Sequence, residues 1–127
     1  MLGQNLKKKD LFVPVNELEK HKDKKKIWRI RVNQELKRDY KKIFKLIDKI
    51  IFLEIPSFKH VYKWRLLQEK KLRITSKGKK IMTDFQVKNF IMFYERLTKH
   101  MLNTLTKKAD TVIKIDNKHR LKSIKFN

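Results

Sequence analysis

The chain has no cysteine, two glycines, two prolines and a single alanine, Ala109. The absence of cysteine excludes disulfide bonds and thiolate metal sites. No apolar run approaches the roughly 20 residues that span a bilayer, and the longest, residues 50–53, has the length of a buried strand. The first residues contain no apolar stretch of the kind found in signal peptides. We therefore expect a cytoplasmic location and no membrane span.

Acidic residues are also scarce, with 13 against 35 basic ones, which gives a formal net charge of +22. Such an excess indicates an anionic partner, of which nucleic acid is one. The abundance of Lys, Ile and Asn is also what AT-rich codons produce, so part of the charge has a compositional origin. A positive surface equally suits an enzyme that acts on ATP and a small carboxylate or phosphate. The charge alone leaves both interpretations open.

Hydrophobic residues make up 40% of the 127 residues, which is enough for one folded domain covering residues 1–127. Apolar positions recur at intervals of three and four over residues 27–47 and 84–105, which predicts helices there. Thr83 and Gln86 form a capping box at the start of the second helix. Residues 1–13 show no period and are expected to form a loop.

The run 50–55 is apolar on almost every residue, which is typical of a parallel strand covered on both faces. Ser57 is an N-cap for a following helix that reaches residue 72 and leads into a basic loop at 75–80. Residues 111–115 alternate as a second strand, and 121–126 are a weaker strand candidate. The order of helices and strands predicts an α/β fold, with a small parallel sheet and flanking helices.

Several short runs lie in an order and spacing that a known family shares. They are 14–19, 28–33, Tyr40, 56–58, Val61, Trp64-Arg65, Gln68-Glu69, 90–91, 94–102, Ala109-Asp110, Asp116 and His119-Arg120. Together they resemble, over about residues 11 to 120, the C-terminal half of a P-loop kinase of the D-glycerate 3-kinase type. The run 94–102, Tyr-Glu-Arg-Leu-Thr-Lys-His-Met-Leu, is the most specific of them.

The resemblance implies the C-terminal portion of a P-loop NTPase three-layer fold and an ATP-dependent kinase that phosphorylates a hydroxyl of a sugar acid such as D-glycerate. The phosphate-binding sequence G-x-x-x-x-G-K-[ST] does not occur in the chain. The acidic residues that hold magnesium in such kinases also belong to the missing half. We therefore expect the chain to be a truncated kinase, inactive alone, with ATP as cofactor and Mg²⁺ only in a complete enzyme, and Met1 to be internal to a longer protein.

The resemblance makes Arg65 the catalytic candidate, placed near the lid to meet the phosphates of ATP. An ion pair with Glu69, four residues on, is the structural alternative. Lys70, Lys71 and Arg73 follow Arg65 toward the lid as candidate cofactor-binding residues. A solvated helix end would explain the same three residues.

Asn117, Lys118 and His119 follow the last parallel strand, at the edge where open α/β sheets bind ligands. The resemblance implies that this loop borders the adenine, while a simple turn is the alternative for Asn117. The candidate substrate-binding residues fall in the motifs on the acceptor side: Asn16, Arg31 and Asn33. Capping would explain both asparagines.

Other chemistry lacks support in the sequence. Glu17 and Glu19 are two residues apart and point away from each other on a helix, so they form no acid/base pair. The four histidines lack metal-ligand spacing, and no metal site is predicted. Trp28 and Trp64 lie beside apolar positions, where burial is favoured over stacking on bases.

Two hypotheses remain, a kinase fragment and a small basic nucleic-acid-binding protein. The second is disfavoured because no helix-turn-helix, zinc-finger or aromatic RNA-binding pattern is present and the lysines are dispersed along the chain. In the first, the partners are a nucleotide and a small sugar acid. The apolar strand at 50–55 would then need cover from the missing N-terminal half or from self-association.

Overall fold

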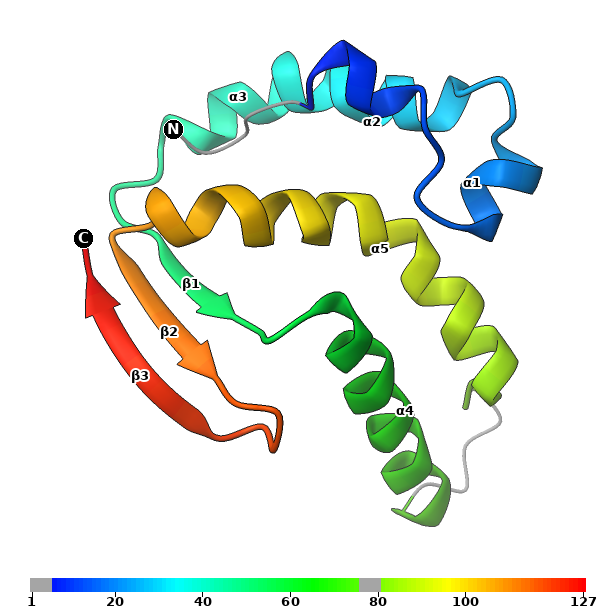
Figure 1. The fold of residues 1–127 in the computed structure, drawn as a ribbon, viewed down its shortest axis with the longest axis vertical. Coiled ribbons are helices and arrows are strands. Elements are labelled where there is room, and N and C mark those ends of the chain that lie inside the picture. The colour runs from blue at the N-terminus through cyan, green and yellow to red at the C-terminus, as the bar shows by residue number, and fades with distance from the viewer. Residues whose placement is uncertain (1–5, 76–80) are drawn as a thin grey trace.

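The computed structural model describes residues 6–75 and 81–127 (Figure 1). The described elements are, in chain order, the 3₁₀ turn η1 (Lys8–Leu11), α1 (Glu17–Lys22), α2 (Ile27–Lys37), α3 (Asp39–Phe44), β1 (Ile51–Glu54), α4 (Phe58–Thr75), α5 (Asp84–Thr104), η2 (Leu105–Lys107), β2 (Thr111–Ile115) and β3 (Leu121–Phe126). The predicted α/β class is confirmed. Most of the basic loop predicted at 75–80 lies outside the described residues.

The sheet has three strands in the order β1-β2-β3. β1 and β2 pair in parallel, with Ile51 opposite Thr111 and Glu54 opposite Lys114, as the sequence predicts. β3 is a strand as well, but it runs antiparallel to β2. The predicted all-parallel sheet is therefore a mixed one, because the short turn between β2 and β3 allows a hairpin and is too short for a crossover.

The starts of β1 and β2 are joined by Asp110. Its carboxylate accepts the Ile50 N–H and a Lys49 Nζ–H, each at 2.9 Å. Asn127, just after β3, donates its N–H to the Asp110 carbonyl and its Nδ2 to that of Ala109. The Lys49 side chain, followed by the Ile50 N–H, lowers the pKa of Asp110. These bonds fix the register of the strands at one end of the sheet.

The two faces of the sheet differ sharply in burial. Residues that pair across neighbouring strands have side chains on the same face of the sheet. At the paired positions of one face, every side chain is apolar except that of Thr111. We call the apolar members the open face: Ile51, Leu53, Ile113, Ile115, Leu121, Ile124 and Phe126. Ile51 and Phe126 are 66% and 78% exposed, whereas Val112 on the other face is 1% exposed. The prediction that residues 50–55 are buried on both faces is wrong for this chain, because no described element covers the open face.

α5 is the main helix of the core, and Figure 1 shows it running from the tip of a helical hairpin with α4 back to the sheet. The predicted capping box is present: Thr83 accepts the Gln86 N–H, and the Gln86 side chain accepts the Thr83 N–H. Val87 and Ile91, on the apolar stripe predicted for this helix, are buried. The predicted helix at 84–105 is confirmed to within one residue.

The helix predicted over 27–47 is divided into α2 and α3 at Arg38, whose backbone angles are φ −95° and ψ −81°. The Arg38 N–H is shared between the carbonyls of Gln34 and Glu35. Tyr40, Ile43 and Leu46 beyond the break are exposed. Without tertiary packing of an apolar face, a continuous helix gains little stability, so the periodic pattern overstated its length.

Candidate functional site

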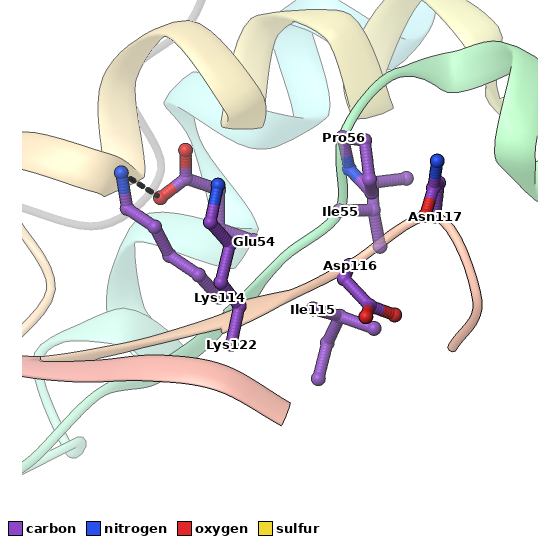
Figure 2. Close-up of a pocket in the computed structure, with 8 residues that line it drawn as sticks. All are labelled: Glu54, Ile55, Pro56, Lys114, Ile115, Asp116, Asn117 and Lys122. Carbon is purple, nitrogen blue, oxygen red and sulfur yellow. Dashed lines mark ion pairs between the residues drawn. The ribbon is translucent and has the colours of Figure 1, made fainter. Parts of the chain in front are cut away.

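A pocket of about 490 Å³ lies where the two parallel strands end. Its lining, drawn in Figure 2, consists of Glu54, Ile55, Pro56, Lys114, Ile115, Asp116, Asn117 and Lys122. The carboxyl edge of parallel strands is the usual ligand-binding position in open α/β sheets. Of the predicted site residues, the structure brings Asn117 to this pocket.

The charged side chains of the pocket come from adjacent strands. Glu54 Oε2 and Lys114 Nζ are 3.5 Å apart across β1 and β2. Figure 2 shows both side chains on the same side of the sheet, with Ile115 pointing to the other. Glu54 Oε2 is buried and accepts no hydrogen bond from the described residues. Buried carboxylate oxygens are normally hydrogen-bonded, and the charge of this one is balanced by the Lys114 ammonium at 3.5 Å.

The turn between β2 and β3 is built on Asp116. Its Oδ1 accepts the N–H groups of Lys118 and Arg120, at 2.9 and 2.8 Å. Its Oδ2 accepts both Nε and Nη2 of Arg120, at 3.0 and 2.9 Å. The hydrogen bond from the Arg120 backbone is the largest cause of the lowered pKa of Asp116, and it outweighs the opposing effect of burial. The predicted turn at Asn117 is therefore present and well hydrogen-bonded.

His119 in this turn has a left-handed backbone, with φ 64°. That conformation costs a non-glycine residue about 1–2 kcal/mol. Its imidazole stacks on the indole of Trp64 from α4, with ring centroids 4.1 Å apart and ring planes within 10°. Trp64 is half-buried, in partial agreement with its predicted burial. Lys118, the third residue predicted in this loop, is exposed and reaches Asp116 through its N–H.

Arg65 faces α5 from α4. Its Nη2 lies 2.5 Å from Glu69 Oε1, and its Nη1 donates to Gln68 Oε1 at 2.6 Å. The ion pair named as the alternative for Arg65 is thus present. Its Nε, however, is buried and has no acceptor within the described residues. The Glu69 carboxylate also accepts the Met82 N–H, so it joins α4 to the start of α5.

The other α4 candidates differ in their contacts. Arg73 donates to the Met82 carbonyl at 2.7 Å and pairs with Asp84 at 2.9 Å, which secures the helical hairpin. Lys70 and Lys71 are exposed to solvent. None of these three residues, nor Arg65, lines the pocket at the sheet edge.

The three acceptor-side candidates do not converge. Asn16 caps α1 by accepting the Glu19 N–H, and it donates to the Met92 carbonyl and to Glu95 on α5. Asn33 exchanges two hydrogen bonds with the backbone of Leu6. Arg31 is exposed and pairs with Glu35 at 2.7 Å. Capping thus accounts for Asn16, while Asn33 fixes the N-terminal segment.

A buried ion network is the feature that sequence reasoning missed. Arg96 on α5 donates Nε and Nη2 to the two carboxylate oxygens of Glu19, and its remaining contacts are the carbonyls of Asp10 and Val13. Arg29 on α2 lies 3.7 Å from the same carboxylate. Glu19, Arg29 and Arg96 are all buried. We call these three residues the Glu19 network, and it joins the N-terminal segment, α1, α2 and α5.

Burial acts to raise the pKa of Glu19. The hydrogen bonds from Arg96 and from the Val15 N–H, together with the charges of both arginines, more than offset this effect, and the pKa is lowered. The carboxylate therefore stays ionised. No local signal in the sequence pairs these residues, because Glu19 and Arg96 lie 77 positions apart.

The described part of the chain contains no group of three or more His, Asp or Glu arranged to hold a metal ion. Within the same residues, every helix is too short or too polar to cross a membrane.

The chain therefore has a small mixed sheet with flanking helices and a polar pocket at the carboxyl edge of its parallel strands. Comparison with known proteins finds a similarity to the uncharacterized kinase mug58 of Schizosaccharomyces pombe, with 38% identity over 78 residues. The matched region is 61% of this chain and 27% of that kinase, so the chain spans about a quarter of its relative. No protein-family model and no solved structure matches. The similarity suggests a relation to kinases.

Proposed function

We propose that the chain is the lid and last-strand part of an ATP-dependent small-molecule kinase with a P-loop fold. The observation that carries this proposal is the pocket at the carboxyl ends of β1 and β2, in a chain similar to a kinase. A nucleotide is the ligand class that fits such an edge. The phosphate acceptor that we propose is the hydroxyl of a sugar acid such as D-glycerate, in keeping with the family resemblance.

The turn Asp116–Arg120 borders the adenine in this proposal. Asn117 lines the pocket and carries an amide that both donates and accepts hydrogen bonds. Glu54 lines the opposite wall, where its carboxylate pairs with Lys114. Lys118 and His119 lie in the same turn, where a nucleotide would contact them.

Arg65 is the cation that meets the phosphates in this proposal. The Arg65 side chain is 28% exposed, and its Nε–H has no acceptor among the described residues. A phosphate can reach this side chain only through its exposed part, because the Nε atom is itself buried. Lys70 and Lys71, exposed on the same helix, would add point charges. Arg31, exposed on α2, is the acceptor-side residue best able to bind an anion.

The open face indicates that the chain has a partner that covers it. Seven apolar side chains on one side of a three-stranded sheet form a surface that soluble monomers rarely expose. In a complete kinase a further polypeptide segment would cover it, and in the isolated chain a second copy is the available cover. Self-association is therefore part of the proposal.

The experiment is a titration of the purified chain with MgATP, followed by amide NMR at two salt concentrations. We expect weak, salt-sensitive binding, with shifts concentrated at residues 114–119 and around Arg65. No hydrolysis of ATP and no phosphorylation of glycerate are expected, because nothing in the sequence cradles the β- and γ-phosphates. Arg65→Ala should weaken ATP binding, with Arg38→Ala, an exposed arginine on the α2–α3 junction, as the matched control.

Two results would contradict the proposal. Magnesium-dependent turnover that Arg65→Ala abolishes would show that the chain is a complete catalyst. Tight binding of a short nucleic-acid duplex, with ATP perturbing no particular residues, would favour the basic nucleic-acid-binding alternative.

A further inference from the structure

The turn Asp116–Arg120 is held to the sheet by the pairing of β2 with β3, and only a contact outside the turn can join it to the helices. Its hydrogen bonds to the Asp116 carboxylate, and the His119 N–H bond to the Asp116 carbonyl at 3.1 Å, stay within the turn. They fix its internal shape and do not fix its place relative to α4. β3, which follows the turn, is exposed along its whole length.

The stack of His119 on Trp64 is such a contact. The two rings are nearly parallel at 4.1 Å, and they join the β2–β3 turn to the second turn of α4. The residue with the left-handed backbone is thus the one whose ring makes this contact. A strained backbone persists only where its surroundings hold it, and this one is surrounded by the hydrogen bonds of the turn and by the stacked indole.

Trp64 is itself held at the start of α4. The His60 ring lies 5.7 Å from the indole in a tilted arrangement, and His60 Nδ1 is 3.1 Å from the Ser57 hydroxyl. Pro56 and Ser57 lie two and three residues after the end of β1, and Pro56 lines the pocket. The indole is thus anchored from the β1 side of the pocket and contacts the β2 side.

We infer that Trp64 is a positioning residue for the pocket: through its stack on His119 it holds the Asp116–Arg120 turn, and with it Asn117, against α4. Arg65, the next residue, faces α5 and pairs with Glu69. One turn of α4 therefore links the base side of the proposed nucleotide site to its phosphate side. This role in ligand binding rests on the proposed function, whereas the placement of the turn does not.

The test uses NMR of the full chain and the variants Trp64→Leu, which removes the ring, and Trp64→Phe, which keeps an aromatic face. Trp28→Phe, at the other tryptophan, is the matched control. In the unmodified chain the His119 ring protons should show upfield ring-current shifts. Trp64→Leu should abolish them and speed amide exchange at 116–120 by about two- to tenfold, the factor an aromatic pair contributes. Trp64→Phe should restore most of both, and Trp28→Phe should change neither.

His119→Gly is a second variant, at an exposed position where misfolding is not expected. Glycine adopts the left-handed backbone freely, so a turn placed by its backbone alone would exchange no faster in this variant. If the stack places the turn, amide exchange at 116–120 should be faster in His119→Gly. Adding Trp64→Leu to His119→Gly should then speed this exchange no further.

A nucleotide titration separates this inference from the proposed function. If MgATP shifts residues 114–119, Trp64→Leu should weaken its affinity about two- to tenfold and Trp64→Phe should recover it. If MgATP has no effect while Trp64→Leu still loosens the turn, the proposed function fails and the positioning role stands. Unchanged His119 ring shifts in Trp64→Leu, with unchanged amide exchange in Trp64→Leu and His119→Gly, would overturn the positioning role whatever ATP does.

Discussion

Replacing Glu19 with glutamine is expected to lower the free energy of unfolding by about 3–5 kcal/mol, the cost of breaking a buried ion pair. The substitution leaves Arg29 and Arg96 buried and facing a neutral amide. Small domains are stabilised by only about 5–15 kcal/mol in total, so the variant should be largely unfolded at modest urea concentration. Urea unfolding followed by circular dichroism measures the effect.

Glu17→Gln is the matched control, since Glu17 lies on the same helix and its side chain is 70% exposed. Its ion pairs with Lys20 and His21 are at the surface, where such pairs contribute about 0–1 kcal/mol. Arg96→Met should resemble Glu19→Gln, because it leaves Glu19 and the carbonyls of Asp10 and Val13 without their donor. Equal stabilities of the two glutamate variants would show that the Glu19 network does not stabilise the fold.

The pH dependence of stability follows from the lowered pKa of Glu19. A carboxylate with a lower pKa in the folded state stabilises the fold above its unfolded pKa of about 4.3. That contribution is lost as the pH falls through the folded pKa. The stability difference between the unmodified chain and Glu19→Gln should therefore be constant from pH 7 to 5 and shrink below about pH 4.3. A difference that grows on acidification would contradict the assigned sign.

Substitution of the open face is expected to change the association of the chain. Leu53 and Ile124 lie on the outer strands of that face and are 58% and 49% exposed. The double variant Leu53→Thr/Ile124→Thr places β-branched side chains, which favour strands, at both positions and reduces the apolar surface. We expect the unmodified chain to self-associate and to bind a hydrophobic dye, and the double variant to dissociate at about tenfold higher concentration, as expected for a loss of about 1.4 kcal/mol.

Sedimentation velocity at moderate salt measures this association, because salt screens the repulsion between chains of charge +22. Ser123→Thr, on the same strand but at a position paired with Lys114 on the other face, is the control and should associate like the unmodified chain. A monomer that unfolds cooperatively and binds no dye would show that the open face needs no cover. The chain would then be a self-sufficient domain, and the basic binding-module alternative would gain support.

The local signals in the sequence were sufficient for most of the secondary structure. The capping box at Thr83 and the period of 84–105 defined α5, because both depend on residues within a few positions of each other. The apolar run at 50–55 and the alternation at 111–115 defined two strands, and their separation by helices implied the parallel pairing that the structure has. The turn at Asn117 was also recognisable from its polar residues.

The contacts between distant residues were decided by the tertiary structure. Glu19 and Arg96 are 77 positions apart, and neither residue reveals the other in the sequence. The break at Arg38 and the exposure of Ile51 depend on which faces find a neighbour, which periodicity does not record. The stack of His119 on Trp64 likewise requires the turn after β2 to reach α4. The sequence alone determined the elements and the net charge, because these are local or additive properties, while pairing across the chain required the fold.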